Sequence, residues 1–427
     1  MSSLYAKLID VIERQITPLA GAIGQQKYVT SIRDGFITAL PFMIVGSFLL
    51  VFIFPPFSPD TTWGFARAWL QFSLDHRDAL MLPFNFSMGV MTLFIAVGIA
   101  ASLAKHHHLD SLTAGMLSLM SFLLVAAPLK DGQISTAYFS GQGIFTAILV
   151  AIYSTELYAF LKRHNITIRL PPEVPAGVAR SFEILIPVLA IILTLHPLNL
   201  FIEAQLGMII PEAIMSLVKP LVAASDTLPA ILLSVLVCQV LWFAGIHGAL
   251  IVTGIMNPFW MANLSVNQAA MAAGTAIPHI YVQGFWDHYL LIGGVGSTLP
   301  LALMLLRSKA VHFNINEPIL FGAPIIMNPL FFLPFVLVPM VNATLAYFAL
   351  KLDLVSRVVS MTPWTTPAPI GASWAANWSF SPVIMCLICI ATAMVMYLPF
   401  LKAYEKQLLE QEHANAAAQA EGAPQSA

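Results

Sequence analysis

Long apolar stretches recur along almost the whole chain, and short segments that carry most of the charged residues separate them. A spanning helix needs about 20 apolar residues, whereas the strands of a lipid-facing barrel are shorter and alternate apolar with polar positions. The stretches are continuous and rich in Leu, Ala, Ile and Met, and they lie near 36–56, 82–104, 111–129, 143–161, 183–205, 228–255, 284–306, 324–350 and 382–401. We therefore predict an all-α polytopic membrane protein with about ten transmembrane helices, including re-entrant pieces.

Composition and charge support this class. Of the 427 residues, 58% are hydrophobic and only 9% are charged, which is far from the balance of a soluble domain. The net charge of -2 gives no indication of a nucleic-acid partner. Basic residues in short loops stay on the cytoplasmic side, so their positions predict a cytoplasmic N-terminus. They are Lys7, Arg14, Lys27, Arg33, Lys105, Lys162, Arg163, Arg169, Arg180, Arg307 and Lys309.

Two arginines depart from this charge pattern. Arg67 and Arg77 fall on the predicted outer side of the membrane. Asp75 and Asp78 offset their charge, so the predicted orientation stands.

The chain is expected to divide at a proline-rich link between Lys162 and Glu183 that cannot span a membrane. After this link, Gly, Pro, Asn, His and Glu interrupt the apolar runs. Broken helices are tolerated at membrane depth only where protein or a watery cavity covers them, so the second half should hold the transport pathway. The predicted parts are a helical scaffold domain at 1–170, an interfacial linker helix at 171–182, a transport domain at 183–401 and a partly disordered cytoplasmic tail at 402–427.

Polar residues within the apolar stretches of the second half are the candidate site. Glu317 follows Asn316 at the head of one such stretch. An acidic side chain at the centre of a spanning helix costs roughly 2.5–3.5 kcal/mol, so it normally faces a polar cavity or a partner. His247 lies between glycines, and the Asn257-Pro258 pair downstream suggests an interrupted helix.

A glycine-rich cluster lies between these two candidates along the chain. It runs from His279 through Gln283 and Asp287 to Gly293–Thr298. Glycines at this density suit a re-entrant hairpin whose free backbone groups meet a ligand, and a flexible outer loop before a capped helix is the alternative.

These segments carry a family resemblance. Trp242–Gly248, Gly293–Thr298 and Asn316–Pro329 resemble the membrane-embedded C subunit of phosphotransferase-system permeases, in the lactose, cellobiose and diacetylchitobiose group. The resemblance implies a multi-pass protein of the bacterial cytoplasmic (inner) membrane, built as a homodimer. It also implies ten spans per subunit, an N-terminal dimerising domain, and a C-terminal sugar-binding domain with two re-entrant hairpins.

The resemblance also implies roles for individual residues. Glu317 and His247 take the family's positions next to the sugar hydroxyl that accepts phosphate. The remaining substrate-binding candidates are Asn316, Trp242, Trp364, Gln283 and Asp287. The implied substrate is a β-linked disaccharide of the cellobiose, chitobiose or lactose type, and the motifs do not choose among them. A cytoplasmic B subunit, itself served by an A subunit, would supply phosphocysteine, so this chain is not expected to phosphorylate sugar alone, and no cofactor or metal is implied.

One departure and one alternative accompany this interpretation. The segment 307–313 is shorter than family members usually have, and a missing amphipathic helix there would impair transport. The alternative is an ion-coupled secondary sugar transporter in which Glu317 and His247 carry protons. This alternative explains a buried ionisable pair equally well, but not the motifs along the whole chain.

Several other polar features have ordinary structural explanations. We expect His106–His108 to form a solvated cytoplasmic loop and Glu156 to form an ion pair with Lys162 and Arg163. Cys386 and Cys389 imitate a CxxC motif but lie in an apolar stretch, which predicts packing residues and no redox or metal site.

Overall fold

The structure is a computed structural model that describes residues 14, 17–130, 132–168, 171, 182–305 and 328–421. The regular elements of these residues are helices, apart from a short antiparallel hairpin of β1 (Leu129–Lys130) and β2 (Gln133–Ile134). The linker residues 172–181, the short segment 307–313 and the last residues 422–427 lie outside the described parts.

Up to Ser225, the described helices are α2 (Thr17–Gly24), α3 (Lys27–Ile53), α4 (Gly64–Asp75), α5 (Arg77–Asn85), η2 (Met88–Val90), α6 (Met91–His106), α7 (Ser111–Ala126), η3 (Gly141–Gly143), α8 (Ile144–Arg163), α10 (Leu185–Leu206) and α11 (Ile210–Ser225). After Ser225 they are α12 (Leu228–Phe243), α13 (Gly248–Ala273), α14 (Gln283–Phe285), η4 (Trp286–Leu290), η5 (Val295–Ser297), α15 (Leu299–Leu305), α17 (Pro329–Lys351), α18 (Ala368–Ala375) and α19 (Ser381–Glu421).

Many of these helices can cross a membrane. Within the described residues, seven are long and apolar enough, or nine if each of two bent pairs forms one span. Those pairs are α11 with α12, bent by 76°, and the segment Gln283–Ser297 with α15, bent by 52°. This confirms an all-α protein with membrane-type helices, while the count of ten spans and the two re-entrant hairpins remain predictions.

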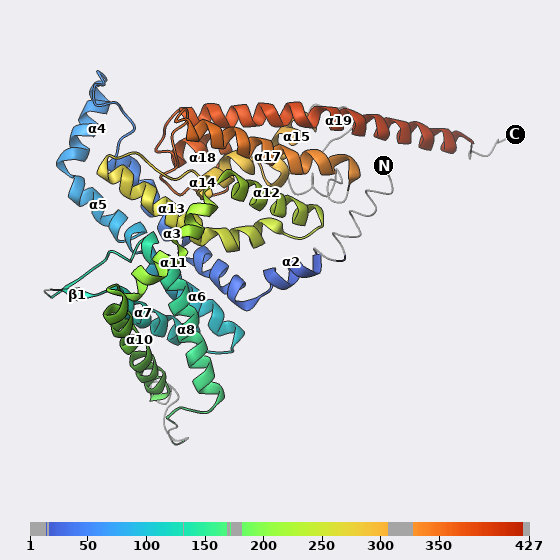
Figure 1. Ribbon diagram of the computed structural model, residues 1–427. Coiled ribbons are helices and arrows are strands. Elements are labelled where there is room, and N and C mark those ends of the chain that lie inside the picture. The colour runs from blue at the N-terminus through green and yellow to red at the C-terminus, as the bar shows by residue number, and fades with distance from the viewer. Residues whose placement is uncertain are drawn as a thin grey trace.

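The helices form two groups (Figure 1). In the first, α6, α7 and α8 pack together, and α3 packs closely on α6. Gly35 and Gly98 permit this approach, because a Cβ atom on Gly98 would lie 3.0 Å from the Cα atom of Gly35. Small residues at such a crossing bring backbones into van der Waals contact, which drives helix association in lipid. The α3–α6 contact therefore holds α3 against the other helices of the first group.

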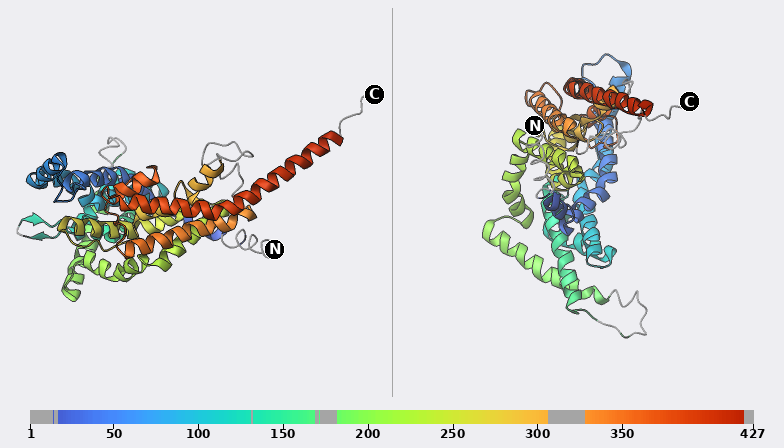
Figure 2. Two further views of the ribbon diagram at one scale, coloured as in Figure 1. Left: turned by 90° about the horizontal axis from the view of Figure 1, so that it is seen from above. Right: turned by 90° about the vertical axis from the view of Figure 1, so that its right-hand side faces the viewer.

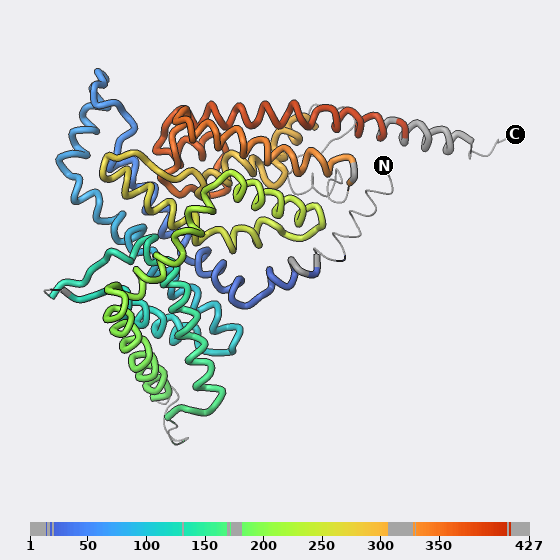
Figure 3. Tube along the Cα trace, viewed as in Figure 1, coloured from blue at the N-terminus to red at the C-terminus, as the bar shows by residue number. Residues whose placement is uncertain are grey.

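The second group contains α12, α13, α17, α18 and α19, with the irregular segment from α14 to α15 among them. The last helix, α19, continues to Glu421 and extends well beyond the other helices (Figures 2 and 3). The helix thus includes most of the expected tail from residue 402 onward.

Helices α10 and α11 follow the linker in sequence but pack against α7 and α8 of the first group. Glu212 at the start of α11 accepts a hydrogen bond of 2.6 Å from the Tyr138 hydroxyl, which precedes α8. Burial of Tyr138 and, to a lesser extent, this hydrogen bond raise the pKa of its phenol to about 12. Residues 185–225 therefore lie beside the predicted scaffold domain, and the predicted domain division itself stays a prediction.

A polar network joins α3, α6 and α8 at one end of the first group. Glu156 Oε1 accepts a hydrogen bond of 2.6 Å from Lys27 Nζ and lies 2.9 Å from His107 Nε2. Arg163 is more distant, at 3.9 Å from Glu156 Oε2, and Lys162 instead lies 4.0 Å from Glu183. The expected ion pair of Glu156 exists, but its closest partners were not the expected ones. The expectation for His107 was wrong, because this side chain is held in the network and not in a solvated loop.

Candidate functional site

Two of the predicted site residues, Glu317 and Asn316, lie outside the described residues. The site is therefore built from the five candidates that the structure places: Trp242, His247, Gln283, Asp287 and Trp364.

The chain interrupts its helices directly before His247. Helix α12 ends at Phe243, Gly245 adopts a φ of 78°, and α13 begins at Gly248. A left-handed residue at this point suits glycine, which has no Cβ atom to clash with the backbone. His247 is the N-cap of α13, and its Nδ1 atom accepts a hydrogen bond of 3.3 Å from the Leu250 amide. His247 lies at the helix break and is exposed at the surface of the protein.

Trp242 and His247 lie together at this break. Their ring centroids are 4.4 Å apart, with an angle of 51° between the ring planes. Trp242 is half-buried, and its indole Nε1 atom is buried without a hydrogen-bond partner in the described chain. The prediction that these two residues share one site is consistent with this contact.

The break that the sequence suggested at Asn257-Pro258 does not exist. Helix α13 runs without interruption from Gly248 to Ala273, with Pro258 buried inside it. A proline removes one backbone donor, and packing against neighbouring helices can compensate for that loss. The interruption is instead at Ala244–His247.

The segment before Gln283 is not helical, but side chains form hydrogen bonds with its backbone. Asp226, in the turn between α11 and α12, accepts hydrogen bonds of 3.1 Å from the Ile280 amide and 2.5 Å from the Tyr281 amide. Its other carboxylate oxygen lies 3.0 Å from His279 Nδ1. Asn267 on α13 binds both the amide and the carbonyl of His279, each at 2.9 Å. Side chains thus replace the backbone hydrogen bonds that a helix would have provided.

Gln283, Asp287 and His288 occupy the helical turns that follow. The side chain of Gln283 interacts with the Asp287 carboxyl group, and Asp287 Oδ2 is buried without a hydrogen-bond partner among the residues described. His288 is 1% exposed, and its Nε2 atom lies 2.6 Å from the Thr362 hydroxyl. Asp287 and His288 therefore place ionisable groups in the interior of the second helix group.

The predicted glycine cluster forms a tight loop after these turns. Gly293, Gly294 and Gly296 adopt φ values of 74°, 114° and 75°, which other residues rarely adopt. A Cβ atom on Gly296 would clash with the Phe335 ring. Residues 295–298 of this loop are buried by protein, whereas Gly293 is exposed.

Two buried side chains hold Gly296 from opposite sides of its peptide backbone. Its amide donates a hydrogen bond of 2.9 Å to Gln239 Oε1, and its carbonyl accepts one of 2.7 Å from the Tyr397 hydroxyl. Gln239 and Tyr397 are both 0% exposed. Gln239 precedes Trp242 by three residues on α12, so the two side chains lie on neighbouring positions of one helix face. This contact connects the glycine loop to the helix that carries Trp242.

Sequence reasoning missed Gln239, Tyr397, Asp226 and Thr362. An amide within an otherwise apolar span was an available signal for Gln239, because such groups need partners inside a membrane.

The structure groups some of the candidates and separates others. Trp242 contacts His247, and Gln283 interacts with Asp287, but no hydrogen bond or ring contact joins these two pairs within the described ranges. Trp364 is 73% exposed, in a loop whose Thr362 reaches His288.

Known proteins are similar to this chain over almost its whole length. A model of the family described as "Phosphotransferase system, EIIC" matches residues 33–339. The chain is 33% identical to the lichenan permease IIC component of Bacillus subtilis, covering 95% of this chain and 96% of that protein. It is 34% identical to the cellobiose-specific EIIC component of Geobacillus stearothermophilus, covering 96% and 97%.

Two further comparisons concern a fused relative and a solved structure. The lactose-specific EIICB component of Lactococcus lactis is 31% identical, and the match covers 95% of this chain and 74% of that protein. The fold is similar to the crystal structure of the transporter ChbC, the IIC component of the N,N'-diacetylchitobiose-specific phosphotransferase system. The TM-score is 0.86 at 33% sequence identity, over 94% of this chain and 99% of that one.

Proposed function

Because the chain belongs to the EIIC family of the phosphotransferase system, we propose that it binds a β-linked disaccharide and presents a sugar hydroxyl to the phosphocysteine of a cytoplasmic B subunit. The family membership makes it a sugar permease of the cellobiose, lactose and chitobiose type. The observation that carries the proposal is the likeness to the chitobiose transporter over 94% of the chain.

Phosphoryl transfer to a sugar requires few groups from the protein. The phosphorus–sulfur bond of phosphocysteine breaks, a phosphorus–oxygen bond to the sugar forms, and the hydroxyl proton leaves. The transition state is loose, so holding the acceptor oxygen in line with the donor contributes more than strong base catalysis. In the proposal Glu317 orients the hydroxyl and accepts its proton, and Asn316 binds the sugar beside it.

His247 and Trp242 are proposed to contact the sugar at the helix break. The exposed part of the His247 ring offers a hydrogen bond to a hydroxyl, and the Trp242 ring offers an apolar face to the sugar's C–H groups. The exposed indole of Trp364 has the same capability. The contact of 4.4 Å between the Trp242 and His247 rings supports a shared role for these two residues.

Buried polar atoms without partners support a role for further residues. Asp287 Oδ2 and Trp242 Nε1 lack hydrogen-bond partners among the described residues. Leaving such a group unpaired costs about 1–3 kcal/mol, which a ligand hydroxyl can recover. Gln283, through its interaction with Asp287, is proposed to orient this carboxyl group.

The partners and the placement in the membrane are also proposed. Relatives named EIICB indicate that a B component accompanies this C component, and an A subunit would phosphorylate B. The proposed assembly is a homodimer with a cytoplasmic N-terminus, with residues 1–170 contributing the dimerising domain. This orientation places the phosphate donor on the same side as Lys27 and Glu156.

Reconstituted vesicles test the proposal against the ion-coupled alternative. With phosphorylated B subunit inside, vesicles should accumulate disaccharide phosphate, and without it they should accumulate no sugar phosphate. An ion-coupled transporter would instead accumulate free sugar in response to a proton gradient. A screen of cellobiose, lactose and chitobiose in the same vesicles identifies the substrate.

A further inference from the structure

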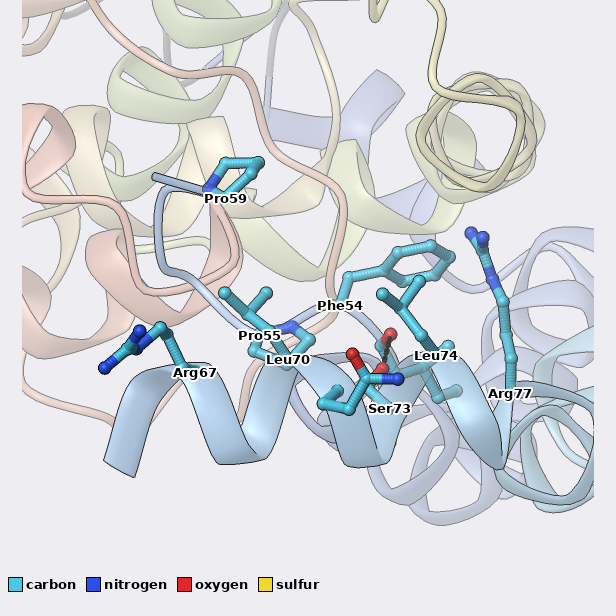
Figure 4. A pocket seen from close by; sticks show the side chains of 10 residues that line it. Phe54, Pro55, Pro59, Arg67, Leu70, Ser73, Leu74 and Arg77 are labelled. Carbon is cyan, nitrogen blue, oxygen red and sulfur yellow. Dashed lines mark hydrogen bonds between the residues drawn. The ribbon is translucent and has the colours of Figure 1, made fainter. Parts of the chain in front are cut away.

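A cavity of about 460 Å³ lies apart from the proposed sugar site, at the end of α3. It is formed by the last turn of α3, the loop that follows, and one face of α4. Figure 4 shows Arg67 and Arg77 at opposite ends of this cavity, with Leu70 and Leu74 between them. Its lining therefore combines two guanidinium groups with apolar side chains and the polar Gln71 and Ser73.

Neither arginine has a direct partner of opposite charge in the described chain. No ion pair involves either of them within the described residues, and no carboxylate belongs to the lining. Asp75, whose charge was expected to offset the arginines, forms no ion pair with them among the described residues, and its carboxylate accepts a hydrogen bond of 2.7 Å from Gln71. The cavity thus presents positive charge although acidic residues are close in sequence.

Arg77 is also held in place. Its guanidinium lies 4.7 Å from the centroid of the Phe54 ring and donates a hydrogen bond of 3.3 Å to the Ala272 carbonyl. A guanidinium fixed in this way loses less conformational entropy when it binds an anion, and its planar donors suit phosphate oxygens.

The aromatic residues around the cavity suit a position at the level of lipid headgroups. Trp69 on α4 packs against Phe52 of α3 at 5.9 Å and against Phe57 of the loop at 5.6 Å. Tryptophan is enriched at the boundary between water and lipid. Along α3, Phe52 and Val45 are exposed by 41% and 61%, so an apolar surface leads from the cavity along the first spanning helix.

We propose that this cavity binds the headgroup of an acidic phospholipid, with its phosphate on Arg77, its negative charge also attracted by Arg67, and its acyl chains along the exposed face of α3. Charge complementarity selects an anion, and the adjoining apolar surface selects a lipid over a soluble anion. In the proposed orientation, with a cytoplasmic N-terminus, this site accounts for two arginines on the outer side, where basic residues are otherwise scarce.

The test measures how lipid stabilises the purified full chain in detergent. Dioleoyl phosphatidylglycerol should raise the thermal unfolding midpoint of the wild type, and dioleoyl phosphatidylcholine should not. Arg67→Gln and Arg77→Gln should each weaken the apparent affinity roughly fivefold, the equivalent of about 1 kcal/mol per basic residue at an anionic surface. Lys219→Gln, which removes an exposed cation on α11, should leave the affinity unchanged.

Four results would overturn the proposal. The first is equal stabilisation by the zwitterionic lipid, and the second is unchanged affinity in the Arg67→Gln/Arg77→Gln double variant. The third is equal stabilisation by inorganic phosphate, which would indicate a soluble anion. The fourth is efficient disulfide cross-linking of a Leu70→Cys variant into dimers in native membranes, which would mean that a second copy covers the cavity. Because sugar phosphorylation plays no part in these readouts, their failure would leave the proposed function untouched.

Discussion

Substituting Gly296 by alanine should destabilise the protein strongly, because this residue faces two separate costs. Its φ of 75° is left-handed, and forcing a residue with a Cβ atom into that conformation costs about 1–2 kcal/mol. The new Cβ atom would also clash with the buried Phe335 ring, and overpacking of this kind costs about 1–3 kcal/mol. The expected total is about 2–5 kcal/mol.

Gly274→Ala is the matched control for this prediction. Gly274 ends α13 with a φ of 67°, and a Cβ atom there would have nothing within 4 Å. Gly274→Ala should therefore lower the free energy of unfolding only by the conformational cost, about 1–2 kcal/mol. Thermal unfolding in one detergent should give Gly296→Ala a clearly lower midpoint than Gly274→Ala. Equal midpoints would refute the reasoning that the glycine loop is tightly packed between Phe335, Gln239 and Tyr397.

Two further predictions concern the polar network and the sugar site. Glu156→Gln should lower the thermal unfolding midpoint by more than Glu410→Gln does. Glu156 is held by Lys27 and His107, whereas Glu410 makes an exposed pair with Lys406. Equal midpoints for the two variants would show that the network does not stabilise the protein. Asp287→Asn should raise KM for the sugar about tenfold with little change in kcat, if Asp287 makes a uniform binding contact. Initial phosphorylation rates against sugar concentration measure this, and an unchanged KM would remove Asp287 from the site.

The sequence predicted the helical membrane class because long apolar runs leave few alternatives in lipid. It also identified the irregular backbone at Gly293–Thr298, because glycines at this density do not continue an apolar helix. It identified His247 as a candidate but placed the helix break downstream of it. The same reasoning failed at Pro258, where packing retains the helix despite the lost donor.

Contacts between distant residues could not be predicted from the sequence. Lys162 and Arg163 were the expected partners of Glu156 because they are near it in sequence. The closest partners, Lys27 and His107, are separated from Glu156 by 129 and 49 positions. Likewise, Tyr397 reaches the Gly296 carbonyl across 101 positions. Such pairs depend on how the helices pack, which the apolar pattern alone leaves undetermined.

The most direct test of the proposed function is phosphate transfer from phosphorylated B subunit to cellobiose, or to whichever sugar the screen selects, by Glu317→Gln in vesicles. The variant should insert and fold like the wild type but form little or no sugar phosphate, because the acceptor hydroxyl would lose the carboxylate that orients it. Glu203→Gln, an exposed acidic residue on α10, should retain wild-type transfer. Wild-type phosphorylation by Glu317→Gln would contradict the assignment of this carboxylate to the reacting hydroxyl.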